Sequence, residues 1–332
     1  MATDAVEKED EVSCEENNDI DPFTLCEGIP LYHFSMINDL HRAKAYHIAI
    51  QQAVSAVREK KESVSVLDVG CGSGLLSMMA ARAGSKRVYG CDKAPGMADC
   101  ARGVVAANSL QGSVKIIPKL STLISVGDNE ANDMLDKADI FVSETFGDDP
   151  FSESFLPSLQ HAREHLLNDG AIVVPRGICV YARAIESEEI LNLNSLPSTQ
   201  FSGLDITDWN IFSRARWSCR LLDHSFVALT ESFQAFEMHW DDDAQPIELK
   251  QCVHRDLCAI NTGKLHAFVV WYTLDMFQGC PEISTDCNSS AMTGRHWRQA
   301  VYFMHEPKHV VKGERLSVSV SLHRDRLFFK SS

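Results

Sequence analysis

The chain has 332 residues, of which 46 are acidic and 31 basic, so its formal net charge is −15, and 45% of its side chains are apolar. This length and apolar content suffice for one large core or two moderate ones, while the negative charge argues against nucleic acid as a direct partner and favours cationic partners. No run of about eighteen apolar residues could span a bilayer, and the acidic N-terminus lacks a secretory pattern, so we expect no membrane partner and a cytoplasmic or nuclear location, or both.

Two N-terminal segments come before the first strand signal. Residues 1–30 are acid-rich and poor in apolar periodicity, which predicts a disordered tail. Residues 32–57 carry apolar side chains at helical spacing, which predicts two helices within a segment that spans 31–61.

A glycine-rich turn follows the next apolar run. The run covers residues 64–69 and leads through Gly70, Gly72 and Gly74 into a helix-compatible stretch at 75–82. Glycine is needed where the backbone takes positive φ, and the amides at a helix N-terminus favour an anionic or polar ligand. The pattern therefore predicts a strand, a tight turn and a helix that bind a nucleotide-like cofactor.

Two acidic residues narrow the identity of that cofactor. Asp68 stands just before the first glycine, and Asp92 ends the next apolar run at 88–92. The G-x-G-x-G spacing also differs from the G-x-G-x-x-G of dinucleotide binders. The combination fits S-adenosylmethionine better than NAD, with Asp92 accepting hydrogen bonds from both ribose hydroxyls. A glycine-rich turn without a ligand is the alternative.

Two glutamates follow another predicted strand, at 139–142. Glu144 stands at the carboxyl end of that strand, where open α/β sheets bind their ligands, and Glu153 follows in the same loop. A guanidinium stays protonated and offers a planar fork of donors, which two carboxylates can hold in one orientation. The pair therefore predicts a site for a cationic nitrogen. The alternative is an acidic, solvated loop that also contains Asp148 and Asp149.

The apolar pattern changes near Pro175. From 62 to 175 the predicted strands and helices alternate, as in a doubly wound α/β sheet. Beyond it the apolar period changes from about 3.6 to about 2, which predicts a β-rich domain at 176–330, either a barrel or a sandwich. The predicted strands lie at 179–184, 225–231, 267–274, 299–304 and 316–322.

Eleven cysteines are spread along the chain without a dense framework, which is typical of buried thiols in a reducing compartment. Five residues of the second half could be imagined as zinc ligands: Cys252, His254, Cys258, Cys280 and Cys287. Their spacing matches no compact zinc signature, so we expect no metal site.

The motifs together resemble those of the protein arginine methyltransferases. The shared features are the glycine turn, the S-E-x8-E motif that ends at Glu153, and a late G-R-H-W at 294–297. Three segments are most similar to the branch whose members carry two tandem modules, arginine methyltransferases seven and nine: 74–80, 155–162 and 296–303. Two others, 33–39 and 227–233, lean towards nine. The likeness covers about residues 30–330, as a single module.

This resemblance implies an α/β fold: a class I, Rossmann-like S-adenosylmethionine-dependent methyltransferase domain at 62–175, followed by a β-barrel domain at 176–330. The helices at 31–61 would close over the cofactor as a lid. The irregular stretch at 191–217 would be a dimerisation arm, and since the chain shows no second glycine turn we expect a homodimer. The tip of such an arm would be apolar: Trp209, Ile211 and Phe212. A core-facing loop is the alternative for this stretch.

The resemblance also implies roles for single residues. Arg42 would pair with the carboxylate of the cofactor, and the residues expected around the cofactor are His33, Met36, Arg42, Asp68, Gly70, Gly72, Gly74, Asp92, Leu120 and Ser121. The expected catalytic residues are Glu144, Glu153, His296 and Asp39. The two glutamates would clamp the substrate guanidinium, while His296 would pair with Asp39 at the mouth of the pocket.

Some positions depart from the family pattern. Asp92 stands where most relatives have Glu, and Ser121 where many have an acid that accepts a hydrogen bond from the adenine amino group. The tyrosine-rich helix of relatives that make asymmetric dimethylarginine is not evident. Gly147 and Asp148 also alter the loop that tunes the product, which leaves monomethyl and symmetric dimethyl arginine open.

The resemblance therefore implies a protein arginine N-methyltransferase that moves a methyl group from S-adenosylmethionine to a guanidinium nitrogen of arginine in cationic protein substrates. One alternative is a catalytically weak pseudo-enzyme that acts as a binding scaffold, in which case the changes at Asp92 and Ser121 record a weakened cofactor site. Another is a methyltransferase or oxidoreductase for a small molecule, which the glycine turn alone allows. The paired glutamates argue against it, because an uncharged metabolite needs no anionic cage.

Overall fold

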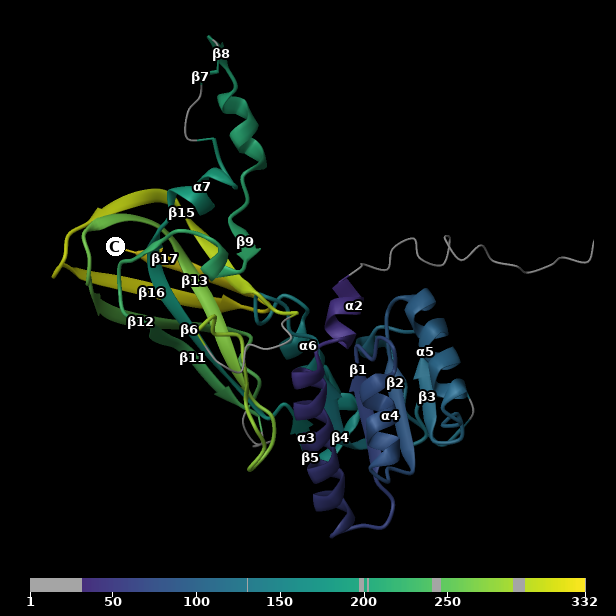
Figure 1. The fold of residues 1–332 in the computed structure, drawn as a ribbon. Helices are drawn as coiled ribbons and strands as arrows, with labels where there is room; N and C mark the ends of the chain where they lie inside the picture. Colours follow the sequence, from purple (N-terminus) through teal and green to yellow (C-terminus); the bar gives the residue numbers. More distant parts are fainter. Residues whose placement is uncertain are drawn as a thin grey trace, which may run out of the picture.

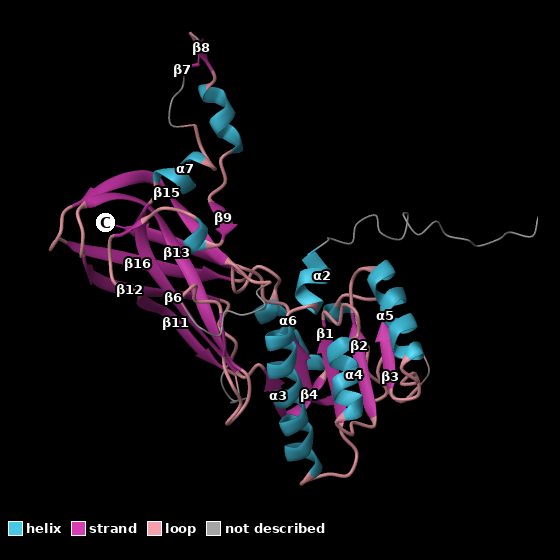
Figure 2. Ribbon diagram, in the orientation of Figure 1, coloured by secondary structure: helices cyan, strands magenta, loops and turns pink. Residues whose placement is uncertain are grey.

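The computed structural model describes residues 32–129, 131–196, 200–201, 203–240, 246–288 and 296–331. The predicted tail at 1–30 and the first two residues of the 294–297 motif lie outside the described residues. An α/β domain is joined to an antiparallel β domain, from which an arm projects (Figure 1). Most of the helical structure covers the sheet of the first domain, whereas the second domain is built mainly of strands (Figure 2).

Within the described residues, two helices precede the first strand, as the helical spacing predicts. They are α2 (Tyr32–Ile37) and α3 (Leu40–Arg58). Asp39 separates them and caps α3, because its carboxylate accepts a hydrogen bond from the backbone N–H of Arg42 at 3.1 Å. The buried stripe of α3 packs against the first domain and consists of Arg42, Ala45, Tyr46, Ala49, Ile50, Ala53 and Val54.

The first domain is a parallel five-stranded sheet with the order β3-β2-β1-β4-β5. All residues of β1 and β4 are buried, because helices α3, α4 and α6 pack on these central strands. The elements are β1 (Ser65–Val69), α4 (Leu75–Arg82), β2 (Arg87–Cys91), α5 (Pro95–Ala107), β3 (Val114–Ile117), η1 (Ser121–Leu123), β4 (Ala138–Ser143), α6 (Phe155–His165) and β5 (Leu167–Val174).

The second domain contains a seven-stranded antiparallel sheet and a three-stranded one, in the orders β10-β6-β13-β15-β9 and β12-β16-β17, with β11 on β6 and β14 on β13. The two sheets pack through rings such as Phe268 and Phe329, whose centroids are 4.9 Å apart. The strands are β6 (Gly177–Glu186), β9 (Arg216–Cys219), β10 (Val227–Ala228), β11 (Phe233–His239), β12 (Lys250–Cys258), β13 (Gly263–Asp275), β14 (Ile283–Ser284), β15 (Gln299–Val310), β16 (Arg315–His323) and β17 (Arg326–Ser331), with η3 (Leu221–Asp223) after β9.

Several of these strands were not predicted from the apolar pattern. In β12 exposed and half-buried residues alternate, but Gln251 and Arg255 occupy half-buried positions, so the sequence shows no apolar alternation. The predicted strand at 225–231 is largely irregular, since only Val227 and Ala228 pair with β6. These errors arise where pairing with a neighbouring strand, rather than local periodicity, decides the structure.

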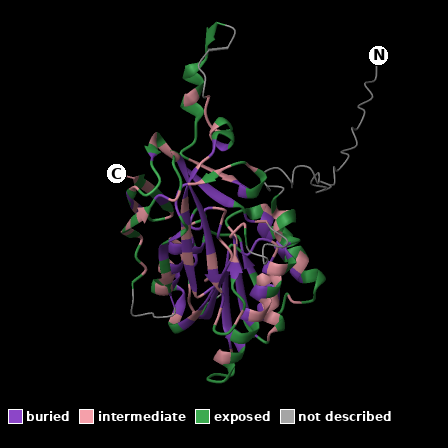
Figure 3. Ribbon diagram, turned by 60° about the vertical axis from the view of Figure 1, so that its left-hand side comes forward, coloured by how far each residue is buried: buried purple, intermediate pink, exposed green. Residues whose placement is uncertain are grey.

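The two domains share a continuous apolar core. Trp240 is fully buried in the second domain, and its ring lies 5.0 Å from that of Phe155 in α6. Its indole N–H donates to the carbonyl of Pro175 at 2.5 Å. Buried residues run through the strands of both domains (Figure 3). This packing fixes the position of the second domain relative to the carboxyl ends of the parallel strands.

The arm leaves the second domain after α7 (Glu188–Asn192) and contains β7 (Gln200–Phe201), β8 (Leu204–Asp205) and η2 (Thr207–Phe212). The predicted tip residues Trp209, Ile211 and Phe212 are 66%, 77% and 64% exposed. The alternative of a core-facing loop is therefore wrong for this stretch. Among the described residues, no helix combines the length and apolar character needed to cross a membrane.

Candidate active site

A cavity of about 550 Å³ opens at the carboxyl ends of β1, β2 and β4, with α2 and the start of α3 along one side. Its volume lies in the range of small-molecule sites. The structure brings residues from six segments of the chain to its wall. The predicted site residues that line it are His33, Met36, Arg42, Gly70, Gly72, Asp92, Leu120, Ser121, Glu144, Glu153 and His296.

The glycine turn forms the floor of the cavity beside β1. Gly70, Gly72 and Gly74 have φ values of 74°, 51° and 77°, which other residues adopt only with strain. A Cβ at Gly70 would stand 2.6 Å from the side chain of Thr145. Gly74 does not line the cavity, because it caps α4 and faces Ala101 in α5. Its place is therefore in helix packing behind the turn.

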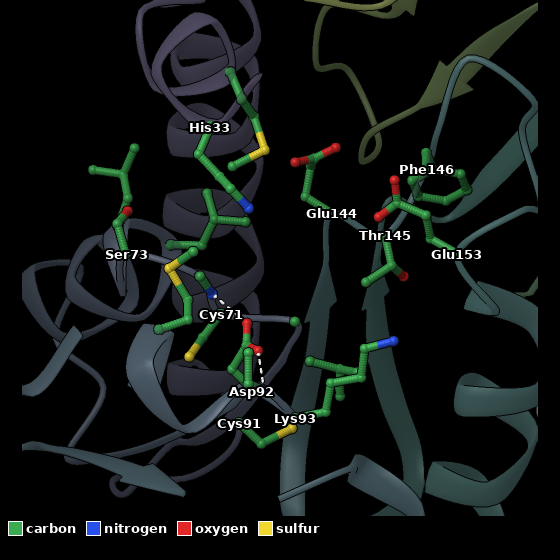
Figure 4. A pocket seen from close by; sticks show the side chains of 18 of the residues that line it. His33, Cys71, Ser73, Cys91, Asp92, Lys93, Glu144, Thr145, Phe146 and Glu153 are labelled. Carbon is green, nitrogen blue, oxygen red and sulfur yellow. Dashed lines mark hydrogen bonds between the residues drawn. The ribbon is translucent and has the colours of Figure 1, made fainter. Parts of the chain in front are cut away.

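The two predicted acids of this region lie in different environments. The Asp92 carboxylate faces the cavity and is held by the backbone N–H groups of Gly72 at 3.2 Å and Ala94 at 2.9 Å (Figure 4). Asp68 is fully buried beneath the turn, where the hydroxyl of Ser77 donates to it at 2.6 Å. Burial raises the pKa of Asp68 to about 7. The expectation that Asp68 contacts the cofactor is therefore not supported, since it does not line the cavity.

Ser121 supplies a polar atom to the cavity at the end of β3. The residue is 2% exposed, and its hydroxyl has no hydrogen-bond partner in the part of the chain that the structure describes. Buried hydroxyls are normally hydrogen-bonded, so an unpartnered one on a cavity wall indicates a ligand contact. Leu120 beside it is 46% exposed and provides an apolar surface.

Glu144 follows β4 directly and forms an ion pair inside the cavity. Nη1 of Arg42 lies 2.6 Å from its Oε2, and the two side chains are 9% and 11% exposed. Arg42 also donates to the carbonyl of Met36 at 2.5 Å and lies over the Trp297 ring. Burial raises the pKa of Glu144 to about 8, which Arg42 opposes and Glu153 reinforces. In this structure the partner of Arg42 is thus a glutamate, and its pairing with a cofactor stays a prediction.

Glu153 lies across the same space from Glu144. Both carboxyl groups point into one part of the cavity, above the loop that joins them (Figure 4). Although residue Glu153 is exposed, partial desolvation of its carboxyl raises its pKa. The charge of Lys93 opposes this rise, and that of Asp148 adds to it. Two carboxylates of raised pKa on one cavity wall make a strong receptor for a cation.

The loop between the glutamates is fastened to the second domain. The indole N–H of Trp297 donates to the carbonyl of Phe146 at 2.7 Å. The hydroxyl of Tyr272 donates to the carbonyl of Gly147 at 2.9 Å. All three of these ring side chains are buried. The geometry of the two glutamates therefore depends on the β domain, although both glutamates belong to the α/β domain.

His296 reaches Asp39 differently from what we expected. The backbone N–H of His296, not its ring, donates to the Asp39 carboxylate at 3.4 Å. Its ring Nδ1 lies 2.9 Å from the hydroxyl of Ser35, which itself donates to the carbonyl of Tyr32. Burial lowers the pKa of His296, and the Arg42 charge lowers it further. Burial and Arg42 thus favour the neutral ring, and Ser35 of α2, which the motifs did not indicate, fixes its orientation.

Other lining residues also escaped the sequence motifs. Tyr46 is buried in α3, and its hydroxyl donates to the carbonyl of Ser143 at 3.0 Å, just before Glu144. Lys93 and Thr145 line the cavity beside predicted residues. Their positions next to Asp92 and Glu144 were a usable signal. Tyr46 gave none, because it reads as one more apolar residue of a helical stripe.

Possible metal ligands lie outside this cavity. Of the five residues considered for zinc, Cys252 and His254 are neighbours on β12, with 4.0 Å between Sγ and Nε2, and no three of the five converge. Among the described residues, Glu186, Glu188 and His266 bring ligand atoms within 4.8 Å of one another. Nδ1 of His266 accepts a backbone N–H at 3.2 Å, so the neutral ring carries its proton on Nε2 and offers no lone pair there to a metal.

Known proteins match both halves of this arrangement. Residues 209–331 match the family model described as the arginine methyltransferase oligomerization subdomain, and residues 47–145 match that of ribosomal protein L11 methyltransferase. An arginine N(omega)-methyltransferase of Streptomyces achromogenes subsp. streptozoticus is 31% identical over 297 residues, which cover 88% of this chain and 76% of that protein. The chain belongs to the arginine methyltransferase family. The resemblance inferred from the motifs is thereby confirmed.

Other arginine methyltransferases extend the comparison. Protein arginine N-methyltransferase 7 of Gallus gallus is 29% identical over 306 residues, which cover 86% of this chain but 43% of that protein. The chain thus spans less than half of the length of this relative.

Solved structures of two relatives share the fold. The Trypanosoma brucei PRMT1 enzyme–prozyme heterotetrameric complex with S-adenosylhomocysteine gives a TM-score of 0.72 at 22% identity, covering 90% of this chain and 96% of that chain. Arabidopsis thaliana protein arginine methyltransferase 10 gives 0.66 at 22% identity, covering 92% and 99%. The predicted Rossmann-like domain followed by a β-barrel is confirmed.

Proposed function

We propose that this arginine methyltransferase transfers a methyl group from S-adenosylmethionine to a terminal guanidinium nitrogen of arginine in a protein. The observation that carries the proposal is the cavity in which Glu144 and Glu153 share a wall with the glycine turn. Glu144 already holds a guanidinium there, that of Arg42. A pocket that binds one planar cationic fork by a carboxylate has the chemistry to bind another.

The residues present fit S-adenosylmethionine. Asp92 keeps further acceptor capacity on both oxygens beyond its two backbone bonds, which suits a pair of ribose hydroxyls. The unpartnered hydroxyl of Ser121 suits a polar edge of adenine beside the apolar Leu120. Gly70 and Gly72 let the ligand approach the backbone, and Arg42, which lines the same cavity, offers a cation to a carboxylate.

In the proposed reaction the protein mainly orients the two substrates and excludes water. Bound S-adenosylmethionine supplies an electrophilic methyl group. Glu144 and Glu153 hold the substrate guanidinium, neutralise its charge and aim one terminal nitrogen at that carbon. The proton leaves the nitrogen late, because a guanidinium of such high pKa is not deprotonated beforehand. His296, neutral and fixed by Ser35, shapes the mouth of the pocket and offers an acceptor for that proton.

The names of the relatives and the net charge of this chain support one substrate class. The Streptomyces relative is named for arginine and the Gallus relative for protein arginine. We favour arginine in cationic protein segments, since a chain of net charge −15 attracts them. We propose monomethyl or symmetric dimethyl arginine as the product, and a cytoplasmic or nuclear location without direct binding to nucleic acid or membranes.

Mass spectrometry of an arginine-rich peptide incubated with labelled cofactor tests the proposal. The matched controls are the same peptide with lysine in place of arginine, and free arginine. Methyl addition to the arginine peptide alone supports protein arginine methylation, and the mass and fragmentation give the product type. Transfer to free arginine alone would overturn the substrate class.

A scaffold without catalysis is tested by calorimetry and one substitution. Tight binding of S-adenosylmethionine is expected, and its absence would favour the scaffold. Glu144→Gln should lower kcat by about 10²-fold or more, as for loss of other charge-stabilising groups. If this variant methylates the peptide at nearly the parental rate, the clamp is wrongly assigned.

We also propose a homodimer formed through the arm. Its 3₁₀ helix η2 exposes Trp209, Ile211 and Phe212, and a cluster of exposed apolar side chains marks an interaction surface. Light scattering on the active protein should give the mass of two chains, and the double variant Trp209→Ser/Ile211→Ser the mass of one. A parental mass of one chain would contradict the proposal.

A further inference from the structure

Two strained turns meet where the α/β domain touches the β domain, directly beside Glu153. In the part of the chain that the structure describes, three residues other than glycine have a positive φ: Ser109, Ser154 and Arg324. Ser154, with φ of 64°, follows Glu153 and lines the cavity. Arg324, with φ of 58°, stands in the turn between β16 and β17. Such residues keep this conformation only where the surrounding structure imposes it.

A hydrogen bond joins the two turns. The hydroxyl of Ser154 donates to the carboxylate of Asp325, the neighbour of Arg324, at 3.1 Å. The hairpin turn is also fixed from the other side, because the backbone N–H of Arg324 donates to the carbonyl of Leu249 at 2.5 Å. Ser154 and Asp325 are both half-buried. The contact is therefore partly sheltered from solvent, and it connects the glutamate loop to the hairpin of β16 and β17.

The hydroxyl of Ser154 is used for this contact and not for its own helix. Ser154 is the N-cap residue of α6, where a serine side chain usually accepts a hydrogen bond from an N–H of the first turn. No side-chain cap bond forms here. The serine thus gives up a contact that would stabilise α6 and makes one with the β domain. Local helix stability does not explain this choice.

The conformation of Ser154 decides where Glu153 points. Phe155, the next residue, is fully buried, so the start of α6 is fixed in the core. A change of φ at Ser154 would therefore move Glu153 and not the helix. The carboxylate of Glu153 now lies close to the backbone of Gly147, since a Cβ added there would stand 3.5 Å from its Oε1. The space for the side chain is thus narrow, and a small rotation would misplace it.

We propose that Asp325 is a positioning residue that holds Ser154 in its left-handed conformation and thereby aims Glu153 into the cavity. Asp325 itself is not among the residues that line the cavity. The turn of the C-terminal hairpin thus takes part in the geometry of the clamp without touching the substrate. The inference rests on the proposed function, in which Glu144 and Glu153 hold the guanidinium.

Five single variants and one double variant test the positioning role. Asp325→Ala removes the acceptor, whereas Asp325→Asn keeps a side-chain oxygen that can accept the same hydroxyl. Ser154→Ala removes the hydroxyl and keeps the backbone strain, while Ser154→Gly removes both. Arg326→Ala is the matched control, because it changes the exposed neighbour of Asp325 in the same hairpin. The double variant is Ser154→Gly/Asp325→Ala.

Kinetics separate positioning from a merely structural contact. We expect kcat on an arginine peptide to fall by about 10–100-fold in Asp325→Ala and Ser154→Ala, and by less in Ser154→Gly. Asp325→Asn and Arg326→Ala should stay within about threefold of the parent, as should cofactor affinity by calorimetry in every variant. In the double variant, Asp325→Ala should add less than about twofold to the loss in Ser154→Gly, because its partner is already gone.

Three kinetic results would overturn the inference: a parental kcat in Asp325→Ala, an equal fall in Arg326→Ala, or independent losses in the double variant. Hydrogen exchange of residues 151–156 without substrate gives a separate test. The segment should exchange faster in Asp325→Ala than in the parent or in Asp325→Asn, and parental exchange would contradict the hold on Ser154. Faster exchange in Asp325→Ala, with no methylation by the parent, would support that hold and refute the proposed function instead.

Discussion

The guanidinium of Arg42 and the carboxylate of Glu144 meet at 2.6 Å within the cavity, on side chains that are about nine-tenths buried. The glutamate at the end of β4 therefore has the geometry and the surroundings to bind a guanidinium. The lid helix α3 supplies this internal cation, and the same arginine is the group expected to face a cofactor carboxylate. One residue thus stands between the cofactor region and the substrate region.

Replacing Arg42 is expected to impair both regions. In Arg42→Ala the buried Glu144 loses the charge that opposes the rise of its pKa, so more of it is protonated at neutral pH. We expect kcat/KM on an arginine peptide to fall by about 10²-fold, and cofactor binding by calorimetry to weaken. Arg183→Ala is the control, because Arg183 also lies over a tryptophan, Trp271, but in the barrel. Equal losses in the two variants would contradict a specific role of Arg42.

The pH dependence of activity should report Glu144. Its pKa is raised to about 8 by burial, so the carboxylate charge that holds the substrate is lost below that pH and gained above it. The substrate arginine stays protonated throughout. We therefore expect kcat/KM, measured with both substrates well below saturation, to rise with pH through about 8. A profile that is flat from pH 6 to pH 9 would show that the ionisation of Glu144 does not limit binding.

Asp68 should make the fold itself sensitive to pH. Its pKa rises from 3.8 to about 7 on folding, so the folded state binds the proton more tightly than the unfolded state. This contribution to stability is present at low pH and is lost as the pH rises through about 7. The free energy of unfolding in urea should therefore fall with pH in the parent but not in Asp68→Asn. Between pH 5 and pH 8 the difference between the two should change by about 2–3 kcal/mol in favour of the variant. If the difference in the free energy of unfolding between variant and parent is the same at pH 5 and pH 8, Asp68 is ionised in the folded protein.

Gly70 should be intolerant of any side chain. Alanine there would carry φ +74° and place its Cβ 2.6 Å from Thr145, next to Glu144. The left-handed backbone costs about 1–2 kcal/mol, and moving Thr145 disturbs the clamp. Gly70→Ala should therefore lower the melting temperature and weaken cofactor binding about tenfold or more. Gly103→Ala, in α5 with open space around it, should instead be neutral or stabilise by up to about 1 kcal/mol.

The parts of the site that could be predicted from sequence depend on local patterns. A buried strand, glycines that permit positive φ and a following helix place Gly70, Gly72 and Asp92 together, because parallel strands end at the same edge of the sheet. The same rule places Glu144 beside them. The family motifs added His296 and Arg42 to this set. These positions line one cavity because the local signals and the sheet order agree.

Other features were decided by contacts between residues far apart in the chain, which no local pattern encodes. The packing of the lid, the barrel and the sheet decides three such contacts. It decides whether Arg42 faces Glu144 and whether His296 meets Asp39 through its ring or its backbone. It also decides whether Asp68 faces the cavity or the core.

The sequence by itself thus determined which functional side chains are available and at which end of the sheet they lie. Only the tertiary structure decided which charge neutralises which, because a buried ion pair such as Arg42 with Glu144 exists only after the lid helix α3 has packed on the sheet.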